Sequence, residues 1–309
     1  MEKRTDLALE VRESFPKDQV EIQGVSLEKR EYLKGRIRIT TVEILNEAGE
    51  QQMKKPKGSY ITIEITPRNY MDTPEEQKNT MDKLAEKLAH VLEDMLEGKI
   101  SGKREHPVYL VAGLGNRFAT PDALGPFVLE DVGVNRHIRK EFGEGALGTG
   151  ERELCAVSPG VMAQTGMESQ EILGGIIDKV SPAGVVVIDA LASRSVNRLC
   201  TTIQITDTGI CPGAGIGNNR NALNQSTLGV PVIAIGVPTV VDAGTIVSEC
   251  METSLQQEGY SEQEIDLFLQ RVSKVNIGNL FVTPKDIDSQ IREIGKVLAK
   301  GINIFAKGK

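Results

Sequence analysis

The chain has 309 residues, of which 39% are hydrophobic and 26% charged, and its formal net charge is −7 at pH 7. This length allows one large or two ordinary domains with a sizeable core. The acidic balance argues against phosphate-contacting nucleic acid binders, so we expect no direct nucleic acid binding. No apolar run is long enough to cross a bilayer, and the first residues lack the apolar core of a signal peptide, which predicts a cytoplasmic protein without membrane contact.

Residues 1–34 are polar and rich in charge without a convincing period, so we expect an extended or loosely held arm. One pentapeptide in this arm, Asp6-Leu-Ala-Leu-Glu10, reads acid, apolar residue, alanine, any residue, glutamate, and this pattern occurs nowhere else in the chain. Composition alone does not distinguish it from an exposed turn of amphipathic helix.

Two alternating stretches, at residues 36–44 and 60–65, predict half-buried strands that pair antiparallel. A basic loop at residues 54–57 lies between them. The stretch after Thr73 opens with Pro-Glu-Glu, a strong helix start, and its apolar residues keep a 3.6-residue period to about Glu97. We therefore expect a long amphipathic helix there.

The rest of the chain alternates strands with helices, and its strands are near-continuous apolar runs. This order predicts an α/β fold with a mainly parallel twisted sheet flanked by helices and an N-terminal antiparallel strand pair. The expected strands are 108–113, 155–157, 184–188, 201–206 and 230–236, and the expected helices are 168–180, 239–257, 261–274 and 285–306, besides one that starts at Thr120 and Pro121 and continues towards Arg139.

Two aspartates follow apolar strands and mark a candidate site. Asp122 comes at the start of the helix after the strand at 108–113, and Asp189 comes directly after the run at 184–188. Both belong to the edge of the sheet where α/β proteins bind ligands. Two carboxylates at short range can share a proton, so one acts as general base on water while the other donates to a carbonyl. Either aspartate could instead complement or cap a helix.

Three further polar residues are candidates to support the pair on this rim: Asn116, Arg194 and Asp207. Asp207-Thr-Gly209 is also the tripeptide of pepsin-like proteases, but those are all-β and need two such loops. We therefore interpret Asp207 as a loop residue near the site and not as half of a dyad.

Other motifs for chemistry are incomplete. Gly113-Leu-Gly115 follows a strand but lacks the third glycine of a dinucleotide-binding fingerprint, and the glycine-rich loop at 209–220 matches no better. The four cysteines and three histidines form no metal-binding or nucleophile–base signature, so we expect neither a metal nor a cofactor.

Four long motifs resemble the germination protease family of endospore-forming bacteria: Thr-Pro-Asp122-Ala-Leu-Gly-Pro, Val-Ile-Asp189-Ala-Leu-Ala-Ser-Arg194, Thr-Thr-Ile-Gln-Ile-Thr-Asp-Thr-Gly-Ile, and Gly-Val-Pro-Val-Ile-Ala-Ile-Gly-Val-Pro-Thr-Val-Val-Asp. The resemblance runs from Arg4 to about Ile246 and resumes at Leu280. Between these segments the chain is shorter than familiar members, which carry a long insertion.

The resemblance implies an atypical aspartic endopeptidase, made as a zymogen in the forespore, that degrades the small acid-soluble proteins coating spore DNA at germination. It implies a fold related to the hydrogenase-maturation proteases, a homotetramer, and catalytic aspartates at Asp122 and Asp189. Family substrates are cut between an acidic and a bulky apolar residue, with alanine next and glutamate nearby. Asp6 and Leu7 therefore become an autocleavage site, and mild acid should speed the cut.

This interpretation makes residues 1–6 a propeptide and 7–309 a single catalytic α/β domain. Within that domain, 7–100 contain the strand pair and helix and 101–309 the parallel-sheet core. Two alternatives stay open. One is a metal-dependent protease of the hydrogenase-maturation type, and the other is a non-enzymatic α/β protein that binds phosphate or a nucleotide in its glycine loops.

Overall fold

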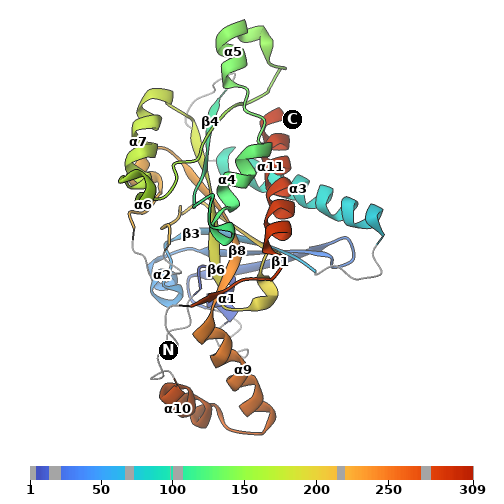
Figure 1. Cartoon of the computed structure of the whole chain (residues 1–309), viewed down its shortest axis with the longest axis vertical. Coiled ribbons are helices and arrows are strands. Elements are labelled where there is room, and N and C mark those ends of the chain that lie inside the picture. Colours follow the sequence, from blue (N-terminus) through green and yellow to red (C-terminus); the bar gives the residue numbers. More distant parts are fainter. Residues whose placement is uncertain are drawn as a thin grey trace.

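The computed structural model describes residues 5–13, 22–66, 73–97, 99, 107–213, 220–272 and 280–308. In these ranges nine strands form one sheet with the order β1-β2-β3-β7-β8-β6-β4-β5, and β9 pairs with β8 (Figure 1). The strands are β1 (Val25–Tyr32), β2 (Ile37–Ile44), β3 (Gly58–Ile65), β4 (Val108–Gly113), β5 (Glu153–Val157), β6 (Gly184–Ser193), β7 (Thr202–Thr206), β8 (Val232–Asp242) and β9 (Phe281–Val282).

The α/β class is confirmed, and the sheet is mixed. The β5-β4-β6-β8 half is parallel, whereas β1, β2, β3 and β7 pair antiparallel and extend the same sheet. The expected pairing of the strands at 36–44 and 60–65 is confirmed as β2 with β3. The two halves join because β7 lies antiparallel to both β3 and β8.

The helices in the described residues cover both faces of the sheet. They are α1 (Ala8–Glu13), α2 (Glu47–Met53), α3 (Pro74–Glu97), α4 (Leu124–Asp131), α5 (Arg136–Phe142), α6 (Met162–Thr165), α7 (Ser169–Val180), α8 (Gln225–Leu228), α9 (Ala243–Gln257), α10 (Glu262–Val272) and α11 (Ile287–Lys307), with 3₁₀ turns η1 (Thr120–Asp122), η2 (Glu144–Ala146) and η3 (Val196–Arg198). The expected helices at 73–97, 168–180, 261–274 and 285–306 are confirmed as α3, α7, α10 and α11. The helix expected from Thr239 is α9, which begins at Ala243 because β8 continues to Asp242. The helix expected from Thr120 towards Arg139 is instead divided into η1, α4 and α5.

The capping chemistry at Thr73 explains where α3 begins. The Glu76 amide donates to the Thr73 hydroxyl at 3.2 Å, and the Glu76 carboxylate accepts from the Thr73 amide at 2.9 Å. This reciprocal pair satisfies amides at the open end of the helix, and Pro74 at the first position needs no partner.

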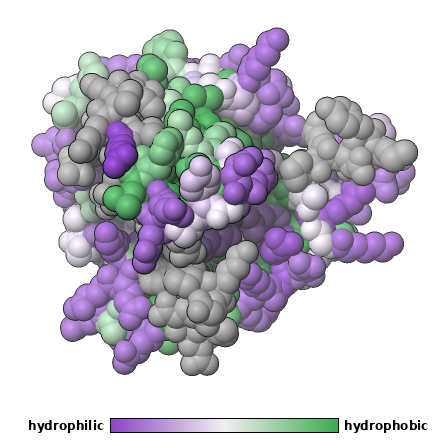
Figure 2. Space-filling view, turned by 90° about the horizontal axis from the view of Figure 1, so that it is seen from below, coloured by the Kyte–Doolittle hydropathy of each residue, from purple (hydrophilic) through white to green (hydrophobic). Residues whose placement is uncertain are grey.

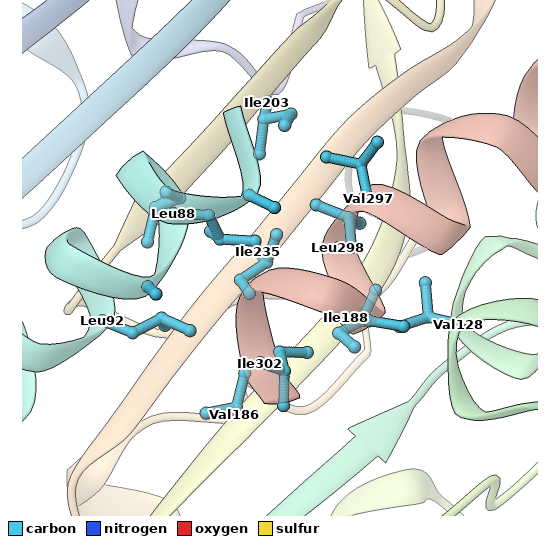
Figure 3. Close-up of a cluster of buried hydrophobic side chains, with 14 of the residues drawn as sticks. Leu88, Leu92, Val128, Val186, Ile188, Ile203, Ile235, Val297, Leu298 and Ile302 are labelled. Carbon is cyan, nitrogen blue, oxygen red and sulfur yellow. The ribbon is translucent and has the colours of Figure 1, made fainter. Parts of the chain in front are cut away.

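The larger core lies between the sheet and three helices, α3, α4 and α11 (Figure 3). Leu88 and Leu92 of α3 and Ile302 of α11 point towards the strand residues Val186 and Ile235. On the opposite face, α7 and α8 pack against the alternate residues of β4, β6 and β8. The sheet is therefore covered on both sides, which explains its continuous apolar strands.

The N-terminal segment differs from the expected loose arm. Leu7, Ala8 and Leu9 are buried, α1 begins at Ala8, and residues 25–32 form β1. The apolar side of the segment packs on β2, β3 and α2 through Ala8 and Met53. Polar composition was misleading here because a few apolar residues suffice to dock a short segment.

Helices α9 and α10 project from the lower end of the sheet (Figure 1). Seen from that side, an apolar area is bordered by hydrophilic side chains (Figure 2). None of the helices in the described ranges combines the length and apolar character that a membrane crossing requires.

Candidate active site

A cavity of about 390 Å³ opens beside β6, just beyond the end of β4. Its lining includes the two predicted aspartates, Asp122 and Asp189, together with Asp6 and Arg220. The structure therefore brings the two aspartates to one cavity and adds a third acidic residue from the N-terminal segment.

Asp122 is the last residue of η1, and the turn after β4 positions it. Its Oδ2 accepts a hydrogen bond from the Asn116 amide at 2.8 Å. Gly115 makes this approach possible: its φ is +104°, and a Cβ there would lie 1.9 Å from the Asp122 carbonyl oxygen. Burial raises the pKa of Asp122, while the Asn116 amide and the charge of Arg220 oppose that rise.

Asp189 lies inside β6, not at its carboxyl end as the apolar run suggested, because β6 and its neighbour β8 both continue past it. It is only 5% exposed, and its Oδ1 accepts from the Ala190 amide at 3.0 Å. Burial raises the pKa of Asp189 well above its usual value, and the charges of Asp122 and Asp6 add to the rise.

The two environments suit different protonation states. Asp189 is the deeper carboxyl and has the stronger reason to keep a proton, whereas Asp122 has an amide donor and a nearby arginine. Two acids whose surroundings separate their pKa values can serve as proton donor and base in one reaction. The arrangement therefore has the chemistry to activate water.

The N-terminal segment enters the same cavity. The Asp6 amide donates to the Ala192 carbonyl oxygen at 3.0 Å, and the Ala192 amide donates to Asp6 Oδ2 at 2.9 Å. The Asp6 carbonyl oxygen accepts from Lys55 Nζ at 3.0 Å and from Gln204 Nε2 at 3.2 Å. The backbone and the carboxylate of Asp6 are thus both hydrogen-bonded to strands of the sheet.

Four residues further along, Glu10 is anchored in a buried anion site. Its carboxylate is 1% exposed and accepts from the amides of Arg194 and Ser195 at 2.7 and 3.2 Å. Arg198 Nη1 lies 3.1 Å from Glu10 Oε1, and the Thr5 hydroxyl also donates to the carboxylate. A buried carboxylate needs this number of partners, so the contact fixes the register of the whole segment.

The predicted supporting residues have different positions. Asn116 contacts Asp122 through its amide, as described above. The Arg194 side chain pairs with Glu249 at 3.0 Å, and only its backbone amide contacts the N-terminal segment. Asp207 accepts from the Ser59 amide at 2.8 Å and pairs with Lys99 at 2.6 Å, so it joins β3 and β7 instead of reaching the cavity.

Sequence reasoning missed Lys55, Gln204, Arg198 and Arg220. Lys55 stood only as one of several basic residues in a loop, and Gln204 as a polar position in an alternating strand. Gln204 could have been identified from the sequence, because it is a polar residue in an otherwise β-branched strand and a buried polar side chain needs a hydrogen-bond partner.

The glycines after β4 have a packing role. A Cβ at Gly113 would lie 2.5 Å from the Gly125 carbonyl oxygen, and one at Gly125 would lie 2.3 Å from the Leu114 carbonyl oxygen. These glycines let α4 lie close on β4. In the described part of the chain, no group of three or more His, Cys, Asp or Glu residues is arranged to hold a metal ion.

Comparison with known proteins gives one consistent family. The sequence model described as germination protease matches residues 2–277. The germination protease of Clostridium tetani is 43% identical over 98% of this chain and 95% of its own. That of Caldanaerobacter subterraneus subsp. tengcongensis is 44% identical over 97% and 93%.

Among solved structures, the [NiFe] hydrogenase maturation protease HycI from Thermococcus kodakarensis is similar to 71% of this chain and 99% of its own. The sequence identity is 20% and the TM-score is 0.35.

Proposed function

Because this chain belongs to the germination protease family and is a peptidase, we propose that Asp122 and Asp189 are the groups with which it hydrolyses peptide bonds. The single observation that carries the proposal is the shared cavity, in which both carboxyls lie beside Asp6 of the chain's own N-terminal segment. Asp122 takes a proton from the attacking water, and Asp189 supplies a proton to the nitrogen that leaves when the peptide bond breaks.

The same proposal makes the chain a zymogen that removes its first six residues by cutting between Asp6 and Leu7. The contacts of the segment support this. Asp6 is held at the cavity by Ala192, and Glu10 by Arg198 and two amides. A chain segment seated in this way excludes other substrates until it is cut.

The substrates we propose are the small acid-soluble proteins of spores, cut at sequences like that of residues 6–10, and the site of action is the spore core. The buried anion site for Glu10 supports a preference for glutamate at the same distance from the cut. Assembly into a homotetramer is part of the same proposal.

Self-conversion of the full chain tests the proposal. At mildly acidic pH the wild type should lose six residues, so that N-terminal sequencing begins Leu-Ala-Leu-Glu. Asp122→Asn and Asp189→Asn should each stay intact while remaining folded, because either substitution removes one proton-transfer group, with an expected loss of at least ~10³-fold in rate.

Asp207→Asn is the matched control, since this aspartate lies outside the cavity, and it should still convert. A product that starts at another residue, or trimming that persists in the Asp122 variant, would show that a different protease makes the cut. A protein that only binds phosphate or nucleotide would leave its own N-terminus untouched.

A further inference from the structure

The peptide group between Asp6 and Leu7 has two side-chain donors on its carbonyl oxygen, and neither is an aspartate. They are Lys55 Nζ at 3.0 Å, from the loop between α2 and β3, and Gln204 Nε2 at 3.2 Å, from β7. The same Gln204 side chain accepts from the Ala8 amide through Oε1 at 2.6 Å. Its amide group is therefore oriented by a partner on each side.

The sheet places these donors opposite the aspartates. Asp189 of β6 and Gln204 of β7 are both register partners of Gly236 on the strand between them, β8. Residues in register across a sheet point to the same face, and two strand spacings separate their Cα atoms by about 10 Å. Asp6 bridges that gap, because it contacts Ala192 of β6 and Gln204 of β7.

We propose that Lys55 and Gln204 are catalytic residues that hold the oxygen of the scissile carbonyl and stabilise the negative charge it gains when water adds. The inference rests on the function proposed above, and it assigns carbonyl activation to this pair instead of to a protonated aspartate. Donors fixed before the reaction act best where water is excluded, and Gln204 is only 7% exposed.

Cleavage then proceeds in three steps. Asp122 removes one proton from water as the water oxygen bonds to the Asp6 carbonyl carbon, and the C=O electron pair moves to the oxygen that Lys55 and Gln204 hold. When the C=O bond re-forms, the C–N bond to Leu7 breaks and the leaving nitrogen takes the proton of Asp189. Proton transfer from Asp122 to Asp189 restores the pair, leaving one carboxyl and one amine.

Lys55 is suited to this role by its surroundings. Burial lowers its pKa, and the charge of Asp6 opposes that change. The Lys55 side chain is half-buried, and its Nζ donates to the Asp6 carbonyl oxygen and lies 5.9 Å from the centroid of the Tyr60 ring. A lysine with only a surface role would keep its amino group in water.

The first test measures the rate of self-conversion of the full chain carrying Lys55→Met, with Lys57→Met as the matched control from the same loop. Lys57 is exposed, and its backbone amide donates to Glu50 Oε1 at 2.6 Å. Losing one oxyanion donor costs about 10²–10³-fold in rate. We therefore expect at least a hundredfold slower conversion with Lys55→Met and an unchanged rate with Lys57→Met.

A second variant, Gln204→Glu, keeps the acceptor for the Ala8 amide and replaces the donor with an oxygen. It should also convert at least tenfold more slowly, and it tests the inference even if Lys55→Met does not fold. Hydrogen exchange of the Ala8 amide separates catalysis from anchoring: we expect the amide to stay protected in both variants while the rate falls.

Conversion within threefold of wild type in either folded variant would overturn the inference, as would loss of Ala8 protection in parallel with the rate. The Asp122→Asn and Asp189→Asn proteins keep the two proposals apart. If these two variants convert normally, the proposed function is wrong. If they fail to convert while Lys55→Met and Gln204→Glu convert normally, the role of the aspartates is supported and the role of Lys55 and Gln204 is contradicted.

Discussion

At the scale of single residues, the cavity collects three acidic residues whose charges act on one another. Asp6 reaches it from the N-terminal segment, Asp122 from a turn and Asp189 from mid-strand. Like charges at short range favour retention of a proton, and the deepest carboxyl keeps it most strongly. This explains why the rise in pKa is larger for Asp189 than for Asp122.

The raised pKa of Asp189 predicts that Asp189→Asn stabilises the fold at neutral pH. Below the usual carboxyl range the group is protonated in both the folded and the unfolded chain, so it costs nothing. As the pH rises through the raised folded-state value, the folded chain loses stability relative to the unfolded chain. An asparagine cannot ionise and avoids that loss.

Scanning calorimetry at pH 7 should give a Tm for Asp189→Asn that is higher by at least about 2 °C, the change expected for roughly 1 kcal/mol. The difference should shrink towards pH 3.5. Asp131→Asn, at an exposed position, should shift the Tm at neither pH. A lower Tm for Asp189→Asn at pH 7 would mean that its carboxyl is held ionised by partners.

At the scale of elements, η3 holds α1 of the N-terminal segment through ion pairs of one arginine. Arg198 of η3 contacts two glutamates of α1, Glu10 and Glu13, and also reaches Glu64 of β3. Three carboxylates around one guanidinium repel each other once that cation is removed. Arg198 therefore adds an ionic contact to the hydrogen bonds and apolar packing that dock residues 5–13.

Arg198→Met should weaken the contact between η3 and α1, because it leaves the buried Glu10 carboxylate with amide and hydroxyl donors. Removing one partner of a buried pair costs on the order of 3 kcal/mol, discounted here because Arg198 is partly exposed. We expect hydrogen exchange at residues 7–13 to rise at least tenfold and self-conversion to slow.

Arg30→Met is the matched control for that variant. Arg30 pairs with Glu28 at 2.7 Å on an exposed strand, where an ion pair contributes little. Exchange in residues 7–13 should be unchanged in this control. If Arg198→Met also leaves that exchange unchanged, the apolar residues Leu7, Ala8 and Leu9 are sufficient to dock the segment.

At the scale of the whole molecule, the sheet unites the two halves of the proposed active site. The donors Lys55 and Gln204 lie towards the antiparallel half, and Asp122 and Asp189 on the parallel half. The join is the antiparallel pairing of β7 with β8, which the core of Figure 3 supports through Ile203 and Ile235. No short fragment of the chain contains the complete constellation.

Removal of metal ions should leave activity unchanged. Among the described residues, no three His, Cys, Asp or Glu side chains are arranged to hold a metal ion, and the proposed steps use only carboxyls, an amine and an amide. We expect exhaustive dialysis against a chelator to preserve both self-conversion and peptide cleavage. Activity that disappears and returns with zinc or nickel would show that the chain is a metal-dependent protease.

The sequence by itself determined most of the helices and strands after residue 35 and identified the two aspartates as candidates. The apolar period and a capping signature predicted α3, and the strand motifs identified Asp122 and Asp189 as candidates, although Asp189 lies inside β6 and not at its end. These features are local: a side chain's spacing along the chain decides which face of its own helix or strand is apolar.

Only the tertiary structure decided which polar groups meet. It placed Leu7–Glu10 in a buried position instead of in a loose arm, and it excluded Asp207 and the Arg194 side chain from the cavity. It also brought Lys55 and Gln204 to one carbonyl oxygen. These contacts depend on strand order and register, which placed β7 beside β8 with Gln204 and Asp189 either side of Gly236. Periodicity contains no information about which strands become neighbours, so partners distant in the chain stay hidden until the sheet is assembled.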